Sequence, residues 1–195
     1  TRLRDDRWHV LTNGFDRKDF VNLPDLPSSG QVTLTYTGSL YGHRNPETLL
    51  QAMELMQKTH PDALQRLRVR FVGRIGDPIK HRLQSSPVAD QIDIIPYVTH
   101  SESLAYLQSS DASLLIIDNA PANAGILTGK LFEYIGADHP ILAFTPEGDA
   151  ANLIRTHQLG VVIPPRDVRT AARVLTDLIE GRLLQANSID TTPFE

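Results

Sequence analysis

The segment 128–134, with the sequence Thr-Gly-Lys-Leu-Phe-Glu-Tyr, places a glycine, a lysine and a glutamate within two turns of an expected helix. A lysine in the first turn opposes the helix dipole, which favours anions at the N-terminus. A glycine there lets another group approach the backbone closely. A bound phosphate would account for both Gly129 and Lys130, because helix N-terminal amides bind anions. Glu133, one turn further along, would then suit a hydroxyl-rich group attached to that phosphate.

The same residues also have ordinary explanations. Lys130 could be a surface lysine whose aliphatic stem covers apolar neighbours, and Glu133 could be a solvated helix residue. Phe132 and Ile135 are expected to pack inward, which leaves Glu133 at the edge of the apolar face. A phosphate site and a solvated helix therefore both stay open at this position.

A second candidate is the loop 38–46, which follows an expected strand and opens an expected helix. Its amides can face an anion, and Arg44 can reach a phosphate with a forked contact. The loop matches neither Gly-x-Gly-x-x-Gly nor Gly-x-x-x-x-Gly-Lys-Ser/Thr, so the dinucleotide and phosphate-loop fingerprints are absent. A solvated arginine without a ligand is the alternative for Arg44.

Three further loops follow expected strands. In the loop 96–99, Tyr97 could hold a nucleobase by stacking and by amide contacts, and packing at the rim of the sheet is the alternative. The loop 73–78 is expected to be only a turn. The loop 118–128 is long, small and polar, which is typical of binding loops, and it leads directly into Gly129.

Alternating strand and helix signals position these loops. The expected strands are 31–37, 68–72, 91–95, 112–117, 140–144 and 161–163. Helices are expected to begin at Asn45 as cap, near Asp77, at the capping box of Thr99, at 128, at Thr145 and at Asp167. This order predicts an α/β fold, with a Rossmann-like parallel sheet of about six strands and helices on both faces. In such sheets ligands bind beyond the carboxyl ends of the strands, at a switch in strand order.

The amino-acid composition limits the kinds of partner that this protein is expected to bind. The chain of 195 residues can form one sizeable core, and its net charge of -4 argues against broad nucleic-acid binding. Cysteine is absent, which excludes disulfides, cysteine-ligated zinc and a thiol nucleophile, and fits a cytoplasmic protein. The seven histidines are scattered without metal-ligand spacing, so no metal is expected. No apolar run is long enough to cross a membrane.

With its loops placed, the chain resembles the C-terminal, donor-binding half of a GT-B glycosyltransferase, most like the retaining glycosyltransferase family four. Segment 10–16 is similar to the family's Ile-Pro-Asn-Gly-Val-Asp junction, 37–40 to its Gly-Arg-Leu loop, and 110–112 to Ala-Asp-Val. Segments 69–73 and 92–104 are similar to the next two strands and the helix start after them. Segments 129–134 and 140–143 are similar to Gly-Lys-Leu-x-Glu-Tyr followed by Pro-Val-Leu-Ala.

The resemblance implies binding of a nucleoside-diphosphate sugar without a metal or other cofactor. Glu133 matches a glutamate that holds ribose hydroxyls, and the amides of Gly129 and Lys130 match groups that meet the distal phosphate. The donor-binding residues that it implies are Gly38, Ser39, Arg44, Tyr97, Val98, Thr128, Gly129, Lys130 and Glu133. Arg44 and Lys130 would stabilise the charge that develops on the leaving nucleoside diphosphate. No general base can be assigned.

Three departures from the family pattern limit what it implies. Ser39 replaces an arginine, which removes one of two expected cations. Gly125 stands where the first glutamate of the family's Glu-x7-Glu motif contacts the sugar, so no sugar preference carries over. The N-terminal domain, which holds the acceptor in this family, is not part of these 195 residues.

Under this resemblance, 1–30 form an interdomain junction and linker, 31–185 the nucleotide-sugar-binding domain, and 186–195 a polar tail. The expected partners are the nucleotide-sugar donor and an N-terminal domain of the same protein, with peripheral membrane contact only through that domain. Alone, the chain is expected to bind donor weakly and to transfer nothing.

Two other functions stay open. One is a nucleotide-sugar epimerase of GT-B shape. The other is a degenerate, non-catalytic nucleotide-binding or interaction module, which the changes at Ser39 and Gly125 leave open.

Overall fold

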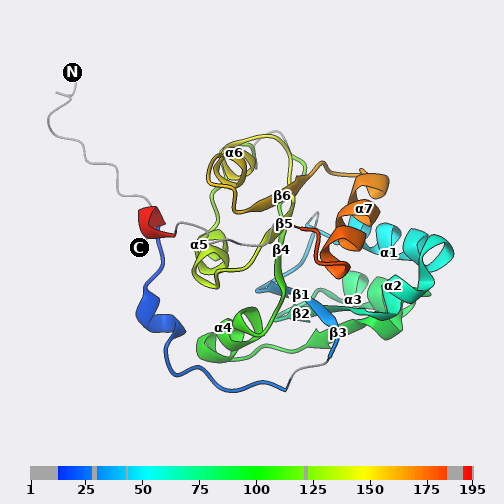
Figure 1. The fold of residues 1–195 in the computed structure, drawn as a ribbon, viewed down its shortest axis with the longest axis horizontal. Helices are drawn as coiled ribbons and strands as arrows, with labels where there is room; N and C mark the ends of the chain where they lie inside the picture. Colours follow the sequence, from blue (N-terminus) through cyan, green and yellow to red (C-terminus); the bar gives the residue numbers. More distant parts are fainter. Residues whose placement is uncertain (1–12, 28–29, 43, 121–122, 184–190, 195) are drawn as a thin grey trace, which may run out of the picture.

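The computed structural model describes residues 13–27, 30–42, 44–120, 123–183 and 191–194, and these form an α/β fold around one parallel sheet (Figure 1). The strands are β1 (Val32–Thr37), β2 (Leu67–Val72), β3 (Ile92–Ile95), β4 (Ala112–Ile116), β5 (Ile141–Phe144) and β6 (Gly160–Ile163). The α-helices are α1 (Glu47–Thr59), α2 (Pro61–Gln65), α3 (Asp77–Gln84), α4 (His100–Gln108), α5 (Gly129–Gly136), α6 (Asp149–Thr156) and α7 (Val168–Ile179). The predicted Rossmann-like sheet is confirmed, with each strand end within one residue of its expected place.

The strand order β3-β2-β1-β4-β5-β6 places the topological switch between β1 and β4. Every pairing is parallel, so the carboxyl ends of all six strands lie at one edge. The chain adds β2 and β3 on one side of β1, and β4, β5 and β6 on the other. The loops that follow β1 and β4 therefore meet at the switch, where a ligand is expected to bind.

Two apolar layers hold the sheet between its helices. Successive side chains of a strand point to opposite faces. In β4, Leu114 and Ile116 belong to the cluster shared with α1 and α7, whereas Leu115 belongs to the cluster shared with α5 and α6. Figure 1 shows α1, α2, α3 and α7 on one side of the sheet and α4, α5 and α6 on the other.

The capping residues predict where α4 begins, but the predicted start of α6 is wrong. The capping box at α4 is present, because Glu102 N–H donates to Thr99 Oγ1 at 3.3 Å and Thr99 N–H donates to Glu102 Oε2 at 2.9 Å. The predicted opening of a helix at Thr145 is wrong, since α6 begins at Asp149. A residue before proline avoids helical torsions, and Thr145 precedes Pro146. Thr145 instead directly follows β5, and its N–H donates to Ile163 O of the neighbouring β6 at 3.4 Å.

The start of α1 also differs slightly from its prediction. The helix begins at Glu47, and its N-cap is Pro46 rather than Asn45. The Asn45 side chain still serves this end, because its Oδ1 accepts from Glu47 N–H at 3.1 Å. A short helix, α2, and a 3₁₀ turn, η3 (Ala89–Gln91), were not expected from the sequence.

The segment 13–27, within the predicted junction, packs against α4 and against Gly136 at the C-terminal end of α5. It contains a 3₁₀ helix, η2 (Arg17–Phe20), and the rings of Phe15 and Phe20 meet edge to face with centroids 6.0 Å apart. Gly136 makes this contact possible, because a Cβ there would lie 2.6 Å from Phe20 Cε2. The junction residues 1–12 and 28–29 lie outside the described ranges.

Residues 191–194, from the predicted polar tail, lie against the same region. The 3₁₀ turn η5 (Thr192–Phe194) buries the Phe194 ring near Phe132, with centroids 6.2 Å apart. Phe15 N–H donates to Phe194 O at 3.0 Å, and Arg17 Nη2 donates to Thr191 Oγ1 at 3.1 Å. Figure 1 shows the blue segment and the red turn side by side.

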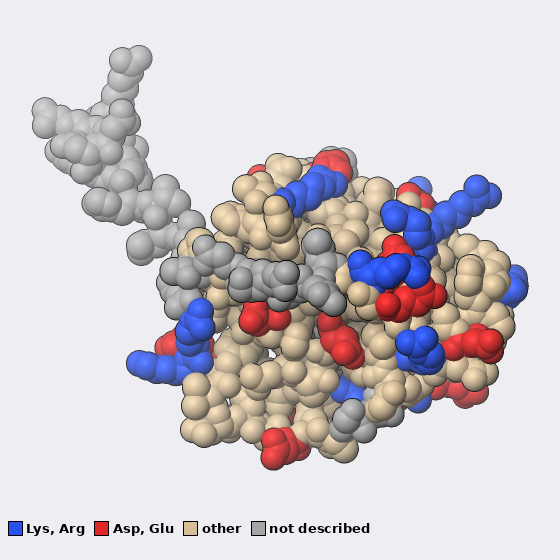
Figure 2. Space-filling view, in the orientation of Figure 1, with Lys and Arg blue, Asp and Glu red and all other residues tan. Residues whose placement is uncertain are grey.

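The face drawn in Figure 2 carries basic and acidic side chains interspersed, most densely on the side where α7 lies. Helix α7 itself bears ion pairs, in which Asp177 meets Arg173 at 3.7 Å and Arg182 at 2.9 Å. This face therefore does not present a broad field of one sign. In the described ranges, no helix is both long and apolar enough to cross a membrane.

Candidate functional site

Helix α5 is fixed to the carboxyl end of β1 by Tyr134. Its hydroxyl accepts a hydrogen bond from Thr37 N–H at 3.1 Å and is fully enclosed. Burial raises the pKa of Tyr134, so the hydroxyl keeps its proton. Leu131 and Ile135, on the same side of the helix, are buried in the core. These contacts bring the first turn of α5, with Gly129 and Lys130, to the switch point of the sheet.

The Lys130 side chain turns inward at this point. Its Nζ donates to Tyr36 OH at 2.8 Å and to Thr37 O at 2.9 Å, and it lies 4.1 Å from the centre of the Tyr36 ring. Burial, and to a smaller extent the nearby Arg44 charge, lower the pKa of Lys130 to about 8, and the Glu133 charge opposes both. The alternative of a solvated surface lysine is therefore wrong.

Arg44 supplies a second positive charge beside Lys130. Burial raises the pKa of Tyr36 to about 12, and the Arg44 guanidinium opposes that shift, which places Arg44 next to the Tyr36 hydroxyl. Tyr36 OH also donates to Ser39 O at 2.8 Å. Arg44 Nε is buried and has no hydrogen-bond partner among the described residues. Two cations held this close repel one another unless an anion lies between them.

The loops after β1 and β2 approach each other closely at Gly73. Its φ is 130°, and a Cβ there would lie 2.3 Å from Gly38 O. Gly38 N–H donates to Val72 O at 2.8 Å, and Gly73 N–H donates to Ile95 O at 2.9 Å. The expectation that 73–78 is only a turn is therefore wrong, because Gly73 shapes the site.

A cavity of about 240 Å³ opens where these loops meet α4 and α5. Its lining comes from the ends of three neighbouring strands and from the first turns of the two helices. The lining residues are Thr37, Gly38, Val72, Gly73, Tyr97, Val98, Thr99, His100, Ser103, Lys130 and Glu133. We call it the donor-side cavity, after the ligand that the sequence resemblance implies for these residues.

Tyr97 stands at the mouth of the donor-side cavity with 71% of its surface exposed. The Arg74 guanidinium carbon lies 5.2 Å from the centre of its ring. The alternative in which Tyr97 packs against the sheet rim is wrong, because most of the ring faces solvent. An exposed aromatic ring with a cation over it is suited to stacking against a planar ligand.

The N-terminus of α5 is open. Thr128 is its N-cap, yet Thr128 Oγ1 makes no capping hydrogen bond, and this buried atom has no partner within the described part of the chain. A Cβ built on Gly129 would meet nothing within 4 Å. Packing of the described residues does not require a glycine here, so the space above Gly129 is free for a ligand.

Glu133 lies opposite His100 of α4, with 4.0 Å between Oε1 and His100 Nδ1. Burial raises the pKa of Glu133, His100 and Lys130 lower it, and Asp19 raises it. A second cavity of about 290 Å³ lies under the junction segment and shares His100 and Glu133 with the donor-side cavity. Sequence reasoning missed His100, since only its place at a helix start was visible.

The structure brings most of the predicted donor residues together. Gly38, Tyr97, Val98, Lys130 and Glu133 line one cavity, whereas Gly129 lines the second cavity and Thr128 is the N-cap of α5. The Ser39 carbonyl oxygen accepts a hydrogen bond from Tyr36 OH, but Ser39 does not line the donor-side cavity. Near Gly125, Asp149 Oδ2 lies 3.8 Å from the place a Cβ would take, so a carboxylate stands beside this position.

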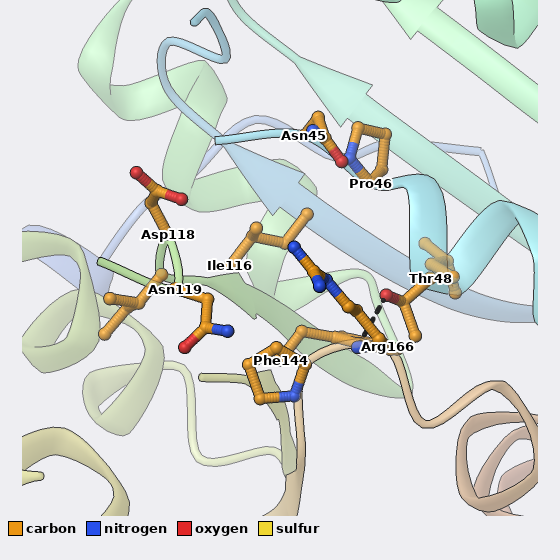
Figure 3. Close-up of a pocket in the computed structure, with 11 residues that line it drawn as sticks. Asn45, Pro46, Thr48, Ile116, Asp118, Asn119, Phe144 and Arg166 are labelled. Atoms are coloured by element: carbon orange, nitrogen blue, oxygen red, sulfur yellow. Dashed lines mark hydrogen bonds between the residues drawn. The ribbon is translucent and has the colours of Figure 1, made fainter. Parts of the chain in front are cut away.

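A separate pocket of about 130 Å³ lies at the ends of β4 and β5, beside the N-terminus of α1 (Figure 3). Arg166 has a φ of 70°, and its N–H donates to Thr48 Oγ1 at 3.1 Å, the dashed line in Figure 3. Its side chain runs across the pocket past Ile116. None of the predicted donor residues lines this pocket, and no motif in the sequence marked Arg166.

The described residues contain no group of three or more histidine, aspartate or glutamate side chains placed to hold a metal ion. The side chains that line the donor-side cavity include one lysine, one glutamate, one histidine, one tyrosine and three hydroxyl-bearing residues.

The open, six-stranded parallel sheet with helices on both faces is the Rossmann-like fold of one half of a GT-B protein. The chain belongs to the group 1 glycosyl transferases, since the family model described as "Glycosyl transferases group 1" matches residues 24–192. No curated protein sequence matches the chain significantly.

Solved structures share the fold at low sequence identity. The glycosyltransferase WaaG, involved in lipopolysaccharide biosynthesis, is 18% identical over 78% of this chain and 39% of its own, with a TM-score of 0.61. The pneumococcal O-GlcNAc transferase GtfA, in complex with UDP and GlcNAc, is 20% identical. The match covers 88% of this chain and 34% of GtfA, with a TM-score of 0.60. A trehalose-6-phosphate synthase is 12% identical, and the match covers 92% of this chain and 44% of the synthase, with a TM-score of 0.67. The chain thus spans less than half of each of these proteins, and none of the three is described as an epimerase.

Proposed function

We propose that this chain is the donor-binding domain of a glycosyltransferase, most like the retaining family four, and that it holds a nucleoside-diphosphate sugar in the donor-side cavity. The observation that carries this proposal is the meeting of Lys130 and Arg44 beside the open first turn of α5. An anion at that point would relieve the repulsion between the cations and would accept from the free amides.

The diphosphate would lie between Arg44, Lys130 and the N-terminus of α5. Thr128 Oγ1 is a buried hydroxyl that lacks a partner in the described chain, and a phosphate oxygen would supply one. The absence of a side chain at Gly129 lets that oxygen reach the backbone amides. As the sugar departs, these fixed donors would stabilise the charge left on the diphosphate without a metal or another cofactor.

The nucleoside would extend from the phosphates towards α4 and β3. The Glu133 carboxylate faces the same cavity, where it can accept hydrogen bonds from ribose hydroxyls. Tyr97 offers an exposed ring to a base, and the backbone beside Val98 offers polar groups for its edge. The UDP in the GtfA structure supports a nucleoside diphosphate as the class of ligand.

The acceptor would be held by an N-terminal domain of the same protein, through which any membrane contact would also be made. We accordingly propose that the chain alone binds donor and transfers no sugar, and that the whole protein works in the cytoplasm. Sugar transfer by these 195 residues alone would contradict this part of the proposal.

The test is calorimetric titration of the chain with UDP, GDP and ADP. At least one diphosphate should bind, and Lys130→Met should weaken it by about tenfold or more, because a charge-assisted contact is lost. Glu133→Gln should weaken the same nucleotide while leaving inorganic pyrophosphate unchanged. Lys80→Met, at an exposed lysine of α3, is the matched control and should bind as the wild type does. Equal affinity in Lys130→Met and the wild type would reject the site, and no binding of any diphosphate would favour an interaction module.

A further inference from the structure

We propose that His100 is a positioning residue for the donor, because its imidazole holds the Glu133 carboxylate charged and turned towards the ribose. This inference rests on the proposed function and adds a residue that neither the sequence motifs nor the family match indicated. Its basis is the 4.0 Å approach of His100 Nδ1 to Glu133 Oε1.

The backbone fixes His100 where it can act. His100 is the first residue of α4, and the preceding Thr99 is locked to Glu102 by the reciprocal capping box. The imidazole therefore starts from a rigid point opposite the second turn of α5. Glu133 is held equally firmly, because the next residue, Tyr134, is bonded to β1.

His100 and Glu133 together form the partition between two cavities. They are the two residues that the donor-side cavity shares with the cavity under the junction segment. The second cavity is acidic, since Asp16 and Asp19 line it. Asp19 opposes the charge of the Glu133 carboxylate, whereas His100 on α4 gives that carboxylate an attractive partner.

The charges that face Glu133 come from three elements. His100 on α4 and Lys130 on α5 stabilise its ionised form, whereas Asp19 on η2 and burial favour its protonated form. Lys130 is already engaged with Tyr36 and Thr37. His100 is therefore the stabilising group that is free to respond to Glu133.

The consequence is a pH dependence specific to ribose. A lower pH favours the positively charged form of an imidazole. A positive His100 should strengthen the hold of Glu133 on the ribose hydroxyls. The pair is partly exposed, so the expected gain is about 2- to 5-fold in affinity. Lys130 titrates at higher pH, and below pH 7.3 it stays mainly charged.

The experiment compares the wild type with His100→Gln at pH 5.8 and pH 7.3, using the nucleoside diphosphate that binds best and inorganic pyrophosphate. The measured quantity is the Kd of the variant divided by the Kd of the wild type, for one ligand at one pH. Titration of the ligand's own phosphates cancels in this ratio. For the nucleotide, the variant should bind about 2- to 5-fold more weakly at pH 5.8 and nearly equally at pH 7.3. Pyrophosphate, which has no ribose, should give a ratio of one at both pH values.

Two variants keep the result interpretable. His81→Gln removes an exposed histidine from α3 and should behave as the wild type does. His100→Lys carries a charge at both pH values, so its nucleotide affinity should match that of the wild type at pH 5.8 and exceed it at pH 7.3. Thermal unfolding of each variant checks that the fold is kept.

The outcomes separate the two proposals. Failure of the wild type to bind any nucleoside diphosphate overturns the proposed function and this inference with it. Nucleotide binding by the wild type with a ratio of one at both pH values overturns only the role of His100. A loss that is as large for pyrophosphate as for the nucleotide also overturns it, because His100 would then act on the phosphates.

Discussion

At the scale of the residue, Lys130 explains most about the site. Its ammonium group loses water but gains two oxygen partners, Tyr36 OH and Thr37 O. The neighbouring Arg44 adds to the cost of keeping this charge. The free protein thus stores an unfavourable positive charge, and a bound diphosphate would release that cost.

This arrangement predicts a pH dependence of diphosphate affinity. The pKa of Lys130 is lowered to about 8, and the diphosphate favours its charged form. Affinity should therefore be high below pH 8 and should fall as the pH rises to 9, by up to about tenfold per pH unit. Binding near pH 8 should also take up a proton, which calorimetry in two buffers of different ionisation enthalpy detects. In Lys130→Met the alkaline fall should disappear, and a fall of the same size would refute its assignment to Lys130.

Gly129 gives a second prediction at this scale. A Cβ at Gly129 meets no atom within 4 Å, so Gly129→Ala should leave the melting temperature unchanged or slightly higher. The added methyl group would stand between the ligand and the α5 amides, and diphosphate affinity should fall about tenfold. Calorimetry and thermal unfolding measure the two effects. Unchanged affinity would show that the ligand does not approach the backbone there.

At the scale of the element, the sequence predicted the framework well. Strand ends were visible because apolar runs stop at Gly38, Gly73 and Pro96, and parallel topology follows from their alternation with helices. The start of α6 was misplaced, since Thr145 and Glu147 look like a helix opening unless the effect of Pro146 is weighed.

The parts of the site that could not be predicted depend on side chains that meet across the fold. Lys130 reaches Tyr36, 94 residues earlier in the chain, through a hydrogen bond that no local pattern encodes. His100 meets Glu133 only because α4 and α5 pack on the same face of the sheet. Arg74 was assigned to a turn, and its position over Tyr97 depends on the adjacency of β2 and β3.

The approach of the β1 and β2 loops can be tested with two glycines in one loop. Gly73→Ala should destabilise the fold by about 2 kcal/mol or more, because its φ of 130° and the 2.3 Å approach to Gly38 O both oppose a side chain. In Gly76→Ala the nearest atom is 3.6 Å away, so this control should lose much less stability, on the order of 0.5 kcal/mol, because Gly76 is the N-cap of α3. Chemical denaturation of both variants decides the matter, and equal stability would argue against the close approach.

At the scale of the whole molecule, the first and last described segments meet on α5. Phe15 N–H donates to Phe194 O, and the Phe194 ring packs against Phe132. Segment 13–27, which lies within the predicted junction, thus packs on the domain. Composition could not show this, because the prolines and serines of 23–30 indicate a linker whatever its neighbours do.

Phe194→Ala tests this closure. Removing the buried ring should lower the free energy of unfolding by about 2 kcal/mol, which is less than the roughly 3–5 kcal/mol of a ring deep in a core, because the site is at the edge of the core. Val21→Ala, at an exposed apolar residue just after η2, is the control. Limited proteolysis should then cut 13–27 faster in Phe194→Ala alone. Equal rates would mean that the two segments are held independently.

The contact between Lys130 and Tyr36 has an optical consequence. The electronic transitions of a phenol respond to a cation over its ring and to the hydrogen bonds of its hydroxyl, and Tyr36 has both. A ligand that draws the Lys130 ammonium away would change both influences at once. Near-ultraviolet difference absorbance should therefore report occupancy of the cavity without any label, and Tyr36→Phe should reduce the signal.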